Sequence, residues 1–347
     1  MMVTVLHTRY LAPALTGVAG SGPVFSAAAV GGAGVDIFFV ISGFVIAITG
    51  PLALSRPSGM LFFWRRWRRV APIYFIVSAP LIVVACQAAP LSIDRLVATV
   101  LFWPATGTSV VYPYLEPGWT LCFEMAFYLA VSLLLAGRSL GRGLVRGAAA
   151  ILALVGASWV AGGPGLRFLA NPMFIEFAGG VALALARQQI FRLGVPLGAV
   201  LLGMGFGALV VEAVIGVGDV DEPLRIMAGV GALHRALTFG LPACAIVAGA
   251  LACEAASHGP IARLLARGGD ISYAIYLTNL MAMEVVVRVW RAAGVAASVP
   301  AMATAGIVTA LAFGVIAYQV IERPILRDLK RLRPIRWPWR TVLVAER

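Results

Sequence analysis

Apolar segments close to twenty residues long alternate with short loops along almost the whole chain. A helix needs about 20 apolar residues to cross the hydrocarbon core of a bilayer, so the pattern predicts about ten transmembrane helices. Their centres fall near residues 11, 41, 79, 127, 154, 178, 204, 243, 280 and 309. The predicted fold class is therefore all-α, a polytopic membrane helix bundle whose first helix looks truncated.

The remaining segments are short. Residues 95–106 are apolar but too few to span, and we expect them to be interfacial or re-entrant. The last helix is expected to end at Ile321-Glu322-Arg323-Pro324, because proline cannot continue a helix. We expect one membrane domain, residues 1–326, followed by a basic tail, residues 327–347.

Composition supports a membrane protein. Of 347 residues, 61% are hydrophobic and 12% charged, against about 25% charged in soluble domains. The formal charge is +12, and most basic residues fall on one side of the membrane if the helices alternate in direction. By the positive-inside rule this side is the cytoplasm, with both termini inside and the protein in the inner (plasma) membrane. In this alternation Arg235 falls in an outer loop. We expect lipids, not nucleic acid, as partners.

The cysteines are Cys86, Cys122, Cys244 and Cys253. None forms a CxxC pair and all have apolar neighbours, so we expect packing roles and no metal site.

Glu124 lies in the middle of the apolar segment 118–129. A carboxylate within hydrocarbon costs roughly 3 kcal/mol or more, so such a residue is usually paired, protonated or functional. Tyr128 follows one turn later on the same helix face, and Trp119 marks the outer end of the segment.

Two further features can carry chemistry. His7, in the first apolar segment, could act as a general base near neutral pH, and a hydrogen-bonded packing role is equally compatible with the residue alone. A dense arginine cluster precedes the third span and consists of Arg65, Arg66, Arg68 and Arg69. Guanidinium groups bind phosphate bidentately. From composition alone a topology anchor or a contact with anionic lipid is favoured.

Other polar residues suggest structural roles when they are taken singly. Asp36 can cap the second span, and Ser42-Gly43 is a small pair that allows close helix contact. Glu176 can complement a helix dipole at its start. Tyr273 and Tyr276 share one face of the ninth span.

Their order and spacing resemble the acyltransferase-3 family of integral membrane acyltransferases, and more closely its exopolysaccharide-production branch. The resemblance covers about residues 3–326 and rests on His7 and on the motifs GVDIFFVISGF, RRWRRVAP, PGWTLCFEMAFYLA, NPMFIEFAGG, GDISYAIYLTN and IERP. It implies a ten-helix enzyme that moves an acyl group, usually acetyl, from cytoplasmic acyl-CoA. The implied acceptor is a sugar hydroxyl on an exported polysaccharide or a lipid-linked glycan.

The resemblance also implies roles for single residues. His7 matches the catalytic base, and Arg66 and Arg69 match paired arginines on the side where CoA is available. The set expected to be catalytic is His7 and Glu124, and the set expected to bind acyl-CoA is Arg65, Arg66, Arg68 and Arg69. The other residues expected to be functional are Asp36, Ser42, Trp119, Tyr128, Tyr273, Tyr276, Asn279 and Glu322.

The implied chemistry needs neither a metal nor a permanently bound cofactor, because thiolate is a competent leaving group once a base takes the hydroxyl proton. Two positions depart from the family pattern. The family has a basic residue eleven positions before its histidine, and only six residues precede His7; either the native start lies upstream, or half of the catalytic motif is missing. Asn279 stands where the family often has histidine. A transporter of glycan or lipid intermediates and an inactive paralogue remain alternative hypotheses.

Overall fold

The computed structural model describes residues 2–16, 30–49, 59–135, 162–215, 222–254, 259–294 and 298–331. Within these ranges, eight helical segments are long and apolar enough to cross a membrane. They are Val30–Thr49, Gly59–Ala88, Gly118–Leu135, Pro164–Leu185, Gly194–Glu212, Ala232–Cys253, Ala262–Ala293 and Val299–Asp328. The prediction of an all-α polytopic membrane bundle is confirmed.

The N-terminal elements are α1 (Met2–His7), η1 (Thr8–Tyr10), α2 (Leu11–Thr16), η2 (Val30–Gly32), α4 (Ala33–Thr49), α5 (Gly59–Ala88), α6 (Ile93–Leu101), β1 (Ala105–Thr106), β2 (Ser109–Val110) and α7 (Gly118–Leu135). The middle elements are α9 (Pro164–Leu169), α10 (Phe174–Leu185), α11 (Arg187–Phe191), α12 (Gly194–Ile215), α13 (Pro223–Met227), α14 (Ala232–Arg235), the π-helical turn η3 (Ala236–Gly240) and α15 (Leu241–Cys253). The chain continues with α16 (Pro260–Ala293), α17 (Val299–Ala317), the π-helical turn η5 (Tyr318–Glu322) and α18 (Arg323–Arg331).

The predicted segments near 41, 79, 127, 178, 204, 243, 280 and 309 each coincide with one of the candidate spans. The segment near 11 is formed by the short elements α1, η1 and α2. The predicted segment near 154 and the tail residues 332–347 lie outside the described residues.

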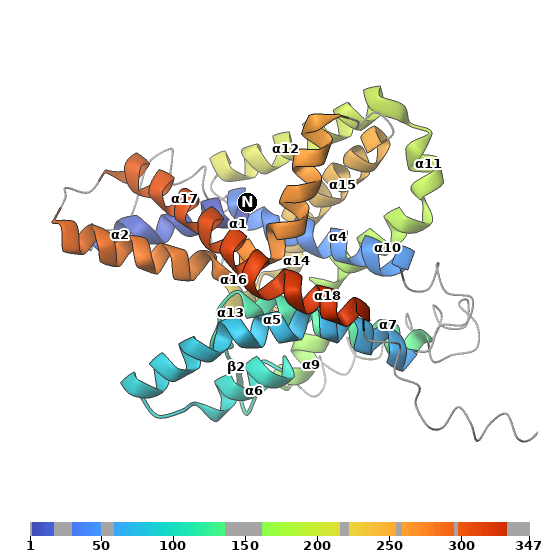
Figure 1. Cartoon of the computed structure of the whole chain (residues 1–347). Coiled ribbons are helices and arrows are strands. Elements are labelled where there is room, and N and C mark those ends of the chain that lie inside the picture. The colour runs from blue at the N-terminus through green and yellow to red at the C-terminus, as the bar shows by residue number, and fades with distance from the viewer. Residues whose placement is uncertain are drawn as a thin grey trace, which may run out of the picture.

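The helices pack in pairs that Figure 1 shows side by side, with α16 against α17, α12 against α15 and α4 against α10. The α4–α10 pair depends on glycine. A Cβ atom at Gly43 would overlap the carbonyl of Phe177, and one at Gly180 would overlap the carbonyl of Val40. The two backbones therefore approach more closely than any larger residue permits, which confirms the close helix contact predicted at Ser42-Gly43.

Aromatic rings fill the space where α4, α7 and α10 meet. The Phe39 and Phe177 rings stack with centroids 4.6 Å apart, and the Phe127 ring also stacks with Phe177, with centroids 4.6 Å apart. Trp119 packs edge-on against Phe39 and Phe123, at 6.4 Å and 6.1 Å. Such offset and edge contacts are the favoured geometries for aromatic pairs. They fix the position of α7, which carries Glu124.

The short segment predicted near 95–106 forms helix α6 and part of a small hairpin. Ser92 caps α6 by accepting a hydrogen bond from the Arg95 amide at 3.3 Å, and Ala105 pairs with Val110 in the β1–β2 ladder. The Arg95 guanidinium lies 4.6 Å from the ring centre of Tyr114 and also donates to the carbonyls of residues 112 and 113. These contacts hold the segment that follows the hairpin against the first turn of α6.

Carboxyl and phenol groups in this hairpin region titrate away from their usual range. Burial raises the pKa of Glu116, an effect that the neighbouring Arg95 partly offsets. Burial also raises the pKa of Tyr112 to about 12, and the nearby charge of Glu116 adds to the shift.

Proline does not end the last span, so the prediction for Pro324 is wrong. The helix continues through α18 to Arg331, with Pro324 directly after the π-helical turn η5. A π-turn shifts the hydrogen-bond register by one residue. Pro324 therefore lies in the first turn of α18, where its missing N–H group breaks no hydrogen bond within the helix. The predicted domain boundary between residues 326 and 327 consequently falls inside α18.

Candidate active site

The arginine cluster lies near the end of the bundle where α5 begins. Arg66 turns inward and donates hydrogen bonds to the Thr49 hydroxyl and, at 3.4 Å, to the Val45 carbonyl at the end of α4. Its guanidinium also lies 5.9 Å from the ring centre of Tyr128. Since carbonyls at a helix C-terminus are electronegative, α4 supplies a natural anchor for this cation.

The other arginines of the cluster have different surroundings. Arg65 and Arg69 are exposed one turn apart on α5, whereas Arg68 is half-buried and its Nε has no hydrogen-bond partner among the described residues. Trp64 and Trp67 stack beside them with ring centres 5.0 Å apart. The cluster is thus divided between an inward cation, Arg66, and cations that remain accessible.

Glu322 lies at the same end of the bundle, at the close of η5. Its side chain is buried and its Oε2 has no hydrogen-bond partner among the described residues. Arg69 of α5 and Asp270 of α16 are its charged neighbours. The closing motif of the chain is therefore brought to the arginine end by the fold.

Glu124 is buried, with 5% of its surface exposed, and it is hydrogen bonded from two helices. The Tyr128 hydroxyl donates to its Oε1 at 2.5 Å and the Ser42 hydroxyl donates to the same oxygen at 3.3 Å. The guanidinium of Arg66 lies over the ring of Tyr128. The structure thus brings the predicted residues Ser42, Glu124 and Tyr128 together with Arg66.

The tyrosines of α16 tie that helix to α5 and α7. Tyr273 donates to the Val70 carbonyl at 3.0 Å, and Tyr276 donates to the Pro117 carbonyl at 2.8 Å. The Thr120 hydroxyl lies 2.7 Å from the Tyr276 oxygen. Thr120 has no distinctive sequence signal, and only the packing of α7 on α16 shows its contact.

His7 and Asn279 meet across 272 positions of sequence. Nδ1 of His7 lies 2.9 Å from Oδ1 of Asn279. Asn279 is fully buried, whereas His7 is half-buried. At a rise of 1.5 Å per residue, Asn279 stands about 9 Å along α16 from Tyr273. The imidazole is thus held about 9 Å along the bundle from the Tyr273 level, away from the arginine end.

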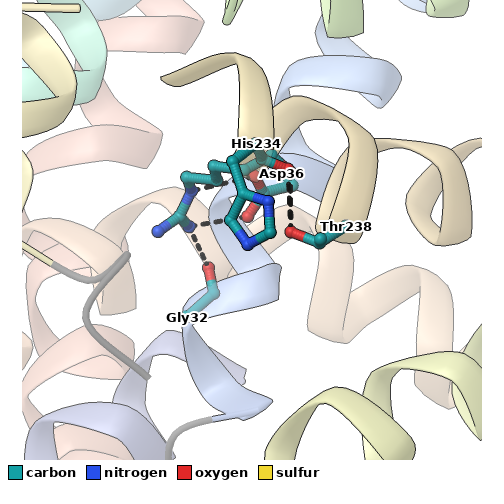
Figure 2. Close-up of polar contacts among 5 residues, drawn as sticks. Gly32, Asp36, His234 and Thr238 are labelled. Carbon is teal, nitrogen blue, oxygen red and sulfur yellow. Dashed lines mark hydrogen bonds and ion pairs between the residues drawn. The ribbon is translucent and has the colours of Figure 1, made fainter. Parts of the chain in front are cut away.

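Asp36 is part of a different polar cluster, which also contains Gly32 and Arg235 (Figure 2). Arg235 donates from Nε to Oδ1 of Asp36 at 3.0 Å and from Nη2 to Oδ2 at 2.7 Å. Nη2 also donates to the Gly32 carbonyl at 3.0 Å. Both side chains are buried, at 0% and 3% exposure. Asp36 therefore bonds to a cation of another helix in place of the capping role that its position suggests.

The placement of Arg235 in an outer loop was wrong, because the residue ends α14 inside a candidate span and is buried. The apolar segment that follows it could have indicated this, since a helix containing Arg235 reaches Cys253 without another basic residue.

Glu176 of α10 lies beside the ion pair, and neither of its carboxyl oxygens has a hydrogen-bond partner among the described residues. It occupies the first turn of its helix, as the sequence suggests.

Fold and site together define a multi-pass membrane protein with a half-buried histidine, a buried acid and a cationic end. The chain belongs to the acyltransferase-3 family: the model of its acyltransferase domain matches residues 1–319. It is therefore a membrane enzyme, an O-acyltransferase.

Curated relatives agree with this assignment. The chain is 30% identical over 309 residues to the exopolysaccharide production protein ExoZ of Rhizobium meliloti (strain 1021), covering 86% of this chain and 90% of the relative. It is 27% identical over 351 aligned positions to the acyltransferase MdmB of Streptomyces mycarofaciens, covering 88% and 83%. No solved structure matches the chain.

Proposed function

We propose that the protein transfers an acyl group, acetyl in the first instance, from cytoplasmic acyl-CoA to a sugar hydroxyl of an exported or lipid-linked polysaccharide. The similarity to a protein named for exopolysaccharide production supports the acceptor class. The membership of an acyltransferase family favours group transfer over the transporter hypothesis. In this proposal the protein lies in the inner membrane with both termini in the cytoplasm.

The observation that carries the proposal is the position of His7 within the bundle. Of the histidines that the structure describes, His234 is exposed, whereas His7 is half-buried and held by Asn279. A base in this position can take the proton of the acceptor hydroxyl while the hydroxyl oxygen attacks the thioester carbonyl. The carbon–sulfur bond then breaks and CoA leaves as the thiolate.

The arginine end supports the donor side of the proposal. CoA carries phosphates, and guanidinium groups are suited to bind them. Arg65 and Arg69 are exposed and can contact the nucleotide part, while Arg66 is committed to α4 and Tyr128. Glu124, bonded to Tyr128 and close to Arg66, is suited to orient that cation and the helices around the donor path.

The test is acyl transfer by purified protein with labelled acetyl-CoA and the polysaccharide of the source strain as acceptor. His7→Ala should abolish transfer and leave the protein in the membrane, while His234→Ala, at an exposed position, should leave transfer unchanged. Full activity of His7→Ala would exclude His7 as the base. Absence of transfer by the wild-type chain would support the inactive-paralogue hypothesis.

A further inference from the structure

The contact between His7 and Asn279 has a consequence for the protonation of the imidazole. A neutral imidazole carries its proton on one ring nitrogen and a lone pair on the other, and the hydrogen bond made by one nitrogen decides which. Oδ1 of Asn279 is an acceptor only, and it lies 2.9 Å from Nδ1. With the amide oxygen facing the ring, the proton in this contact belongs to Nδ1, and Nδ2 of Asn279 has no hydrogen-bond partner among the described residues.

We propose that Asn279 is a positioning residue that holds His7 in the Nδ1-protonated tautomer, so that Nε2 presents its lone pair to the acceptor hydroxyl. This inference rests on the proposed function, since it assigns how the proposed base is prepared. Among the described residues, Nε2 has no hydrogen-bond partner that would oppose this tautomer. An asparagine that cannot itself be a base thereby supports one.

The surroundings of Asn279 make the contact persistent. The side chain is fully buried, so water does not compete for Oδ1. Its helix is fixed three residues earlier by Tyr276, which donates to the Pro117 carbonyl at 2.8 Å. On the other side, Gly31 and Gly34 let α1 pack directly against the start of α4, because a Cβ at either position would crowd residues 2 to 6. Both partners are therefore held by packing that does not depend on the hydrogen bond.

Removal of the acceptor should separate orientation from binding. Asn279→Leu has a similar volume and no acceptor, so the ring is free to turn or to change tautomer. We expect kcat to fall about 100-fold, within the range that a correctly placed general base contributes, with the KM for acetyl-CoA unchanged. Asn279→Asp keeps an acceptor at the same place and should restore most of the turnover. Thr278→Val, which removes only a hydroxyl bonded to the Ala274 carbonyl, is the matched control and should behave as wild type.

The tautomer itself can be read by ¹⁵N NMR of histidine-labelled protein in lipid bilayers, with the His7 signals assigned by their loss in His7→Gln. Protonated Nδ1 and unprotonated Nε2 are expected in the wild type and in Asn279→Asp, and a changed pattern is expected in Asn279→Leu. Protonated Nε2 in the wild type would overturn the inference, as would a pattern and a kcat unaltered by Asn279→Leu.

The failure of this inference differs from the failure of the proposed function. If His7→Gln retains turnover, the proposed base is wrong, whatever the NMR spectrum shows. If His7→Gln is inactive while Asn279→Leu is fully active with its ¹⁵N pattern unchanged, the base stands and the role of Asn279 is wrong. The spectrum is informative even for a variant or preparation that does not turn over. If Asn279→Leu misfolds, the test rests on Asn279→Asp, which should keep most of the turnover and the ¹⁵N pattern of the wild type.

Discussion

The buried Asp36–Arg235 ion pair should contribute far more to the stability of the protein than the same two side chains would contribute at its surface. Two hydrogen bonds, of 3.0 Å and 2.7 Å, join side chains that are 0% and 3% exposed. Removal of one partner from a buried pair costs about 3–5 kcal/mol, because the other charge stays buried without its counter-charge. An exposed pair contributes about 0–1 kcal/mol.

The two single substitutions should differ. Asp36→Asn leaves a guanidinium that cannot lose its proton in a protein and that keeps Glu176 as an acidic neighbour, so we expect a loss of about 4 kcal/mol. Arg235→Met leaves a carboxyl group that can bind a proton and become neutral, so we expect about 3 kcal/mol. The double variant Asp36→Leu/Arg235→Met buries no charge from this pair and should lose less than the sum of the single losses.

The assay is the free energy of unfolding from titration with SDS in mixed micelles, followed by tryptophan fluorescence. The pair formed by Glu284 and Arg288 is a control within the chain, since it has the same 2.7 Å separation with its side chains 42% and 72% exposed. Glu284→Gln should change the free energy of unfolding by less than about 1 kcal/mol. An Asp36→Asn loss as small as this would refute the argument that burial determines the contribution of the pair.

The same preparations test three further expectations. Gly180→Ala should destabilise the bundle by about 1–3 kcal/mol, because its Cβ would overlap the Val40 carbonyl, whereas Gly203→Ala, in open space, should not. Tyr276→Phe should lose about 1 kcal/mol with its hydrogen bond to the Pro117 carbonyl, and an unchanged SDS midpoint would contradict that contact. Glu124→Gln keeps an acceptor for its neighbouring hydroxyls but not the negative charge, so acetyl transfer should fall about 10-fold in a protein that still folds, as measured by transfer from labelled acetyl-CoA.

The helices could be predicted because membrane-spanning helices satisfy their own backbone hydrogen bonds, so length and apolarity are sufficient signals. The candidate spans coincide with predicted segments from Val30 to Asp328. Local breaks were harder to predict. The π-turn before Pro324 depends on how α17 continues into α18, and that continuation has no signature in the residues alone.

The candidate site was predictable as a set of residue types and not as a set of contacts. The depth of Glu124 and the density of arginines in the RRWRR motif are properties of the sequence. That Arg66 turns toward α4 while Arg69 stays exposed is a property of the packed helices. Arg235 was misplaced because a charge at the edge of an apolar segment can end a loop or begin a buried helix, and its partner Asp36 lies 199 residues away.

The sequence by itself determined that this chain is a bundle of membrane helices and that one apolar segment carries an acid. These follow from local composition, since the bilayer acts on each segment separately. Only the tertiary structure decided which polar groups meet: Arg235 with Asp36, Tyr128 with Glu124, and Asn279 with His7. The physical reason is that a polar group removed from water must find its partner within the protein, and that partner is fixed by how helices distant in sequence pack together.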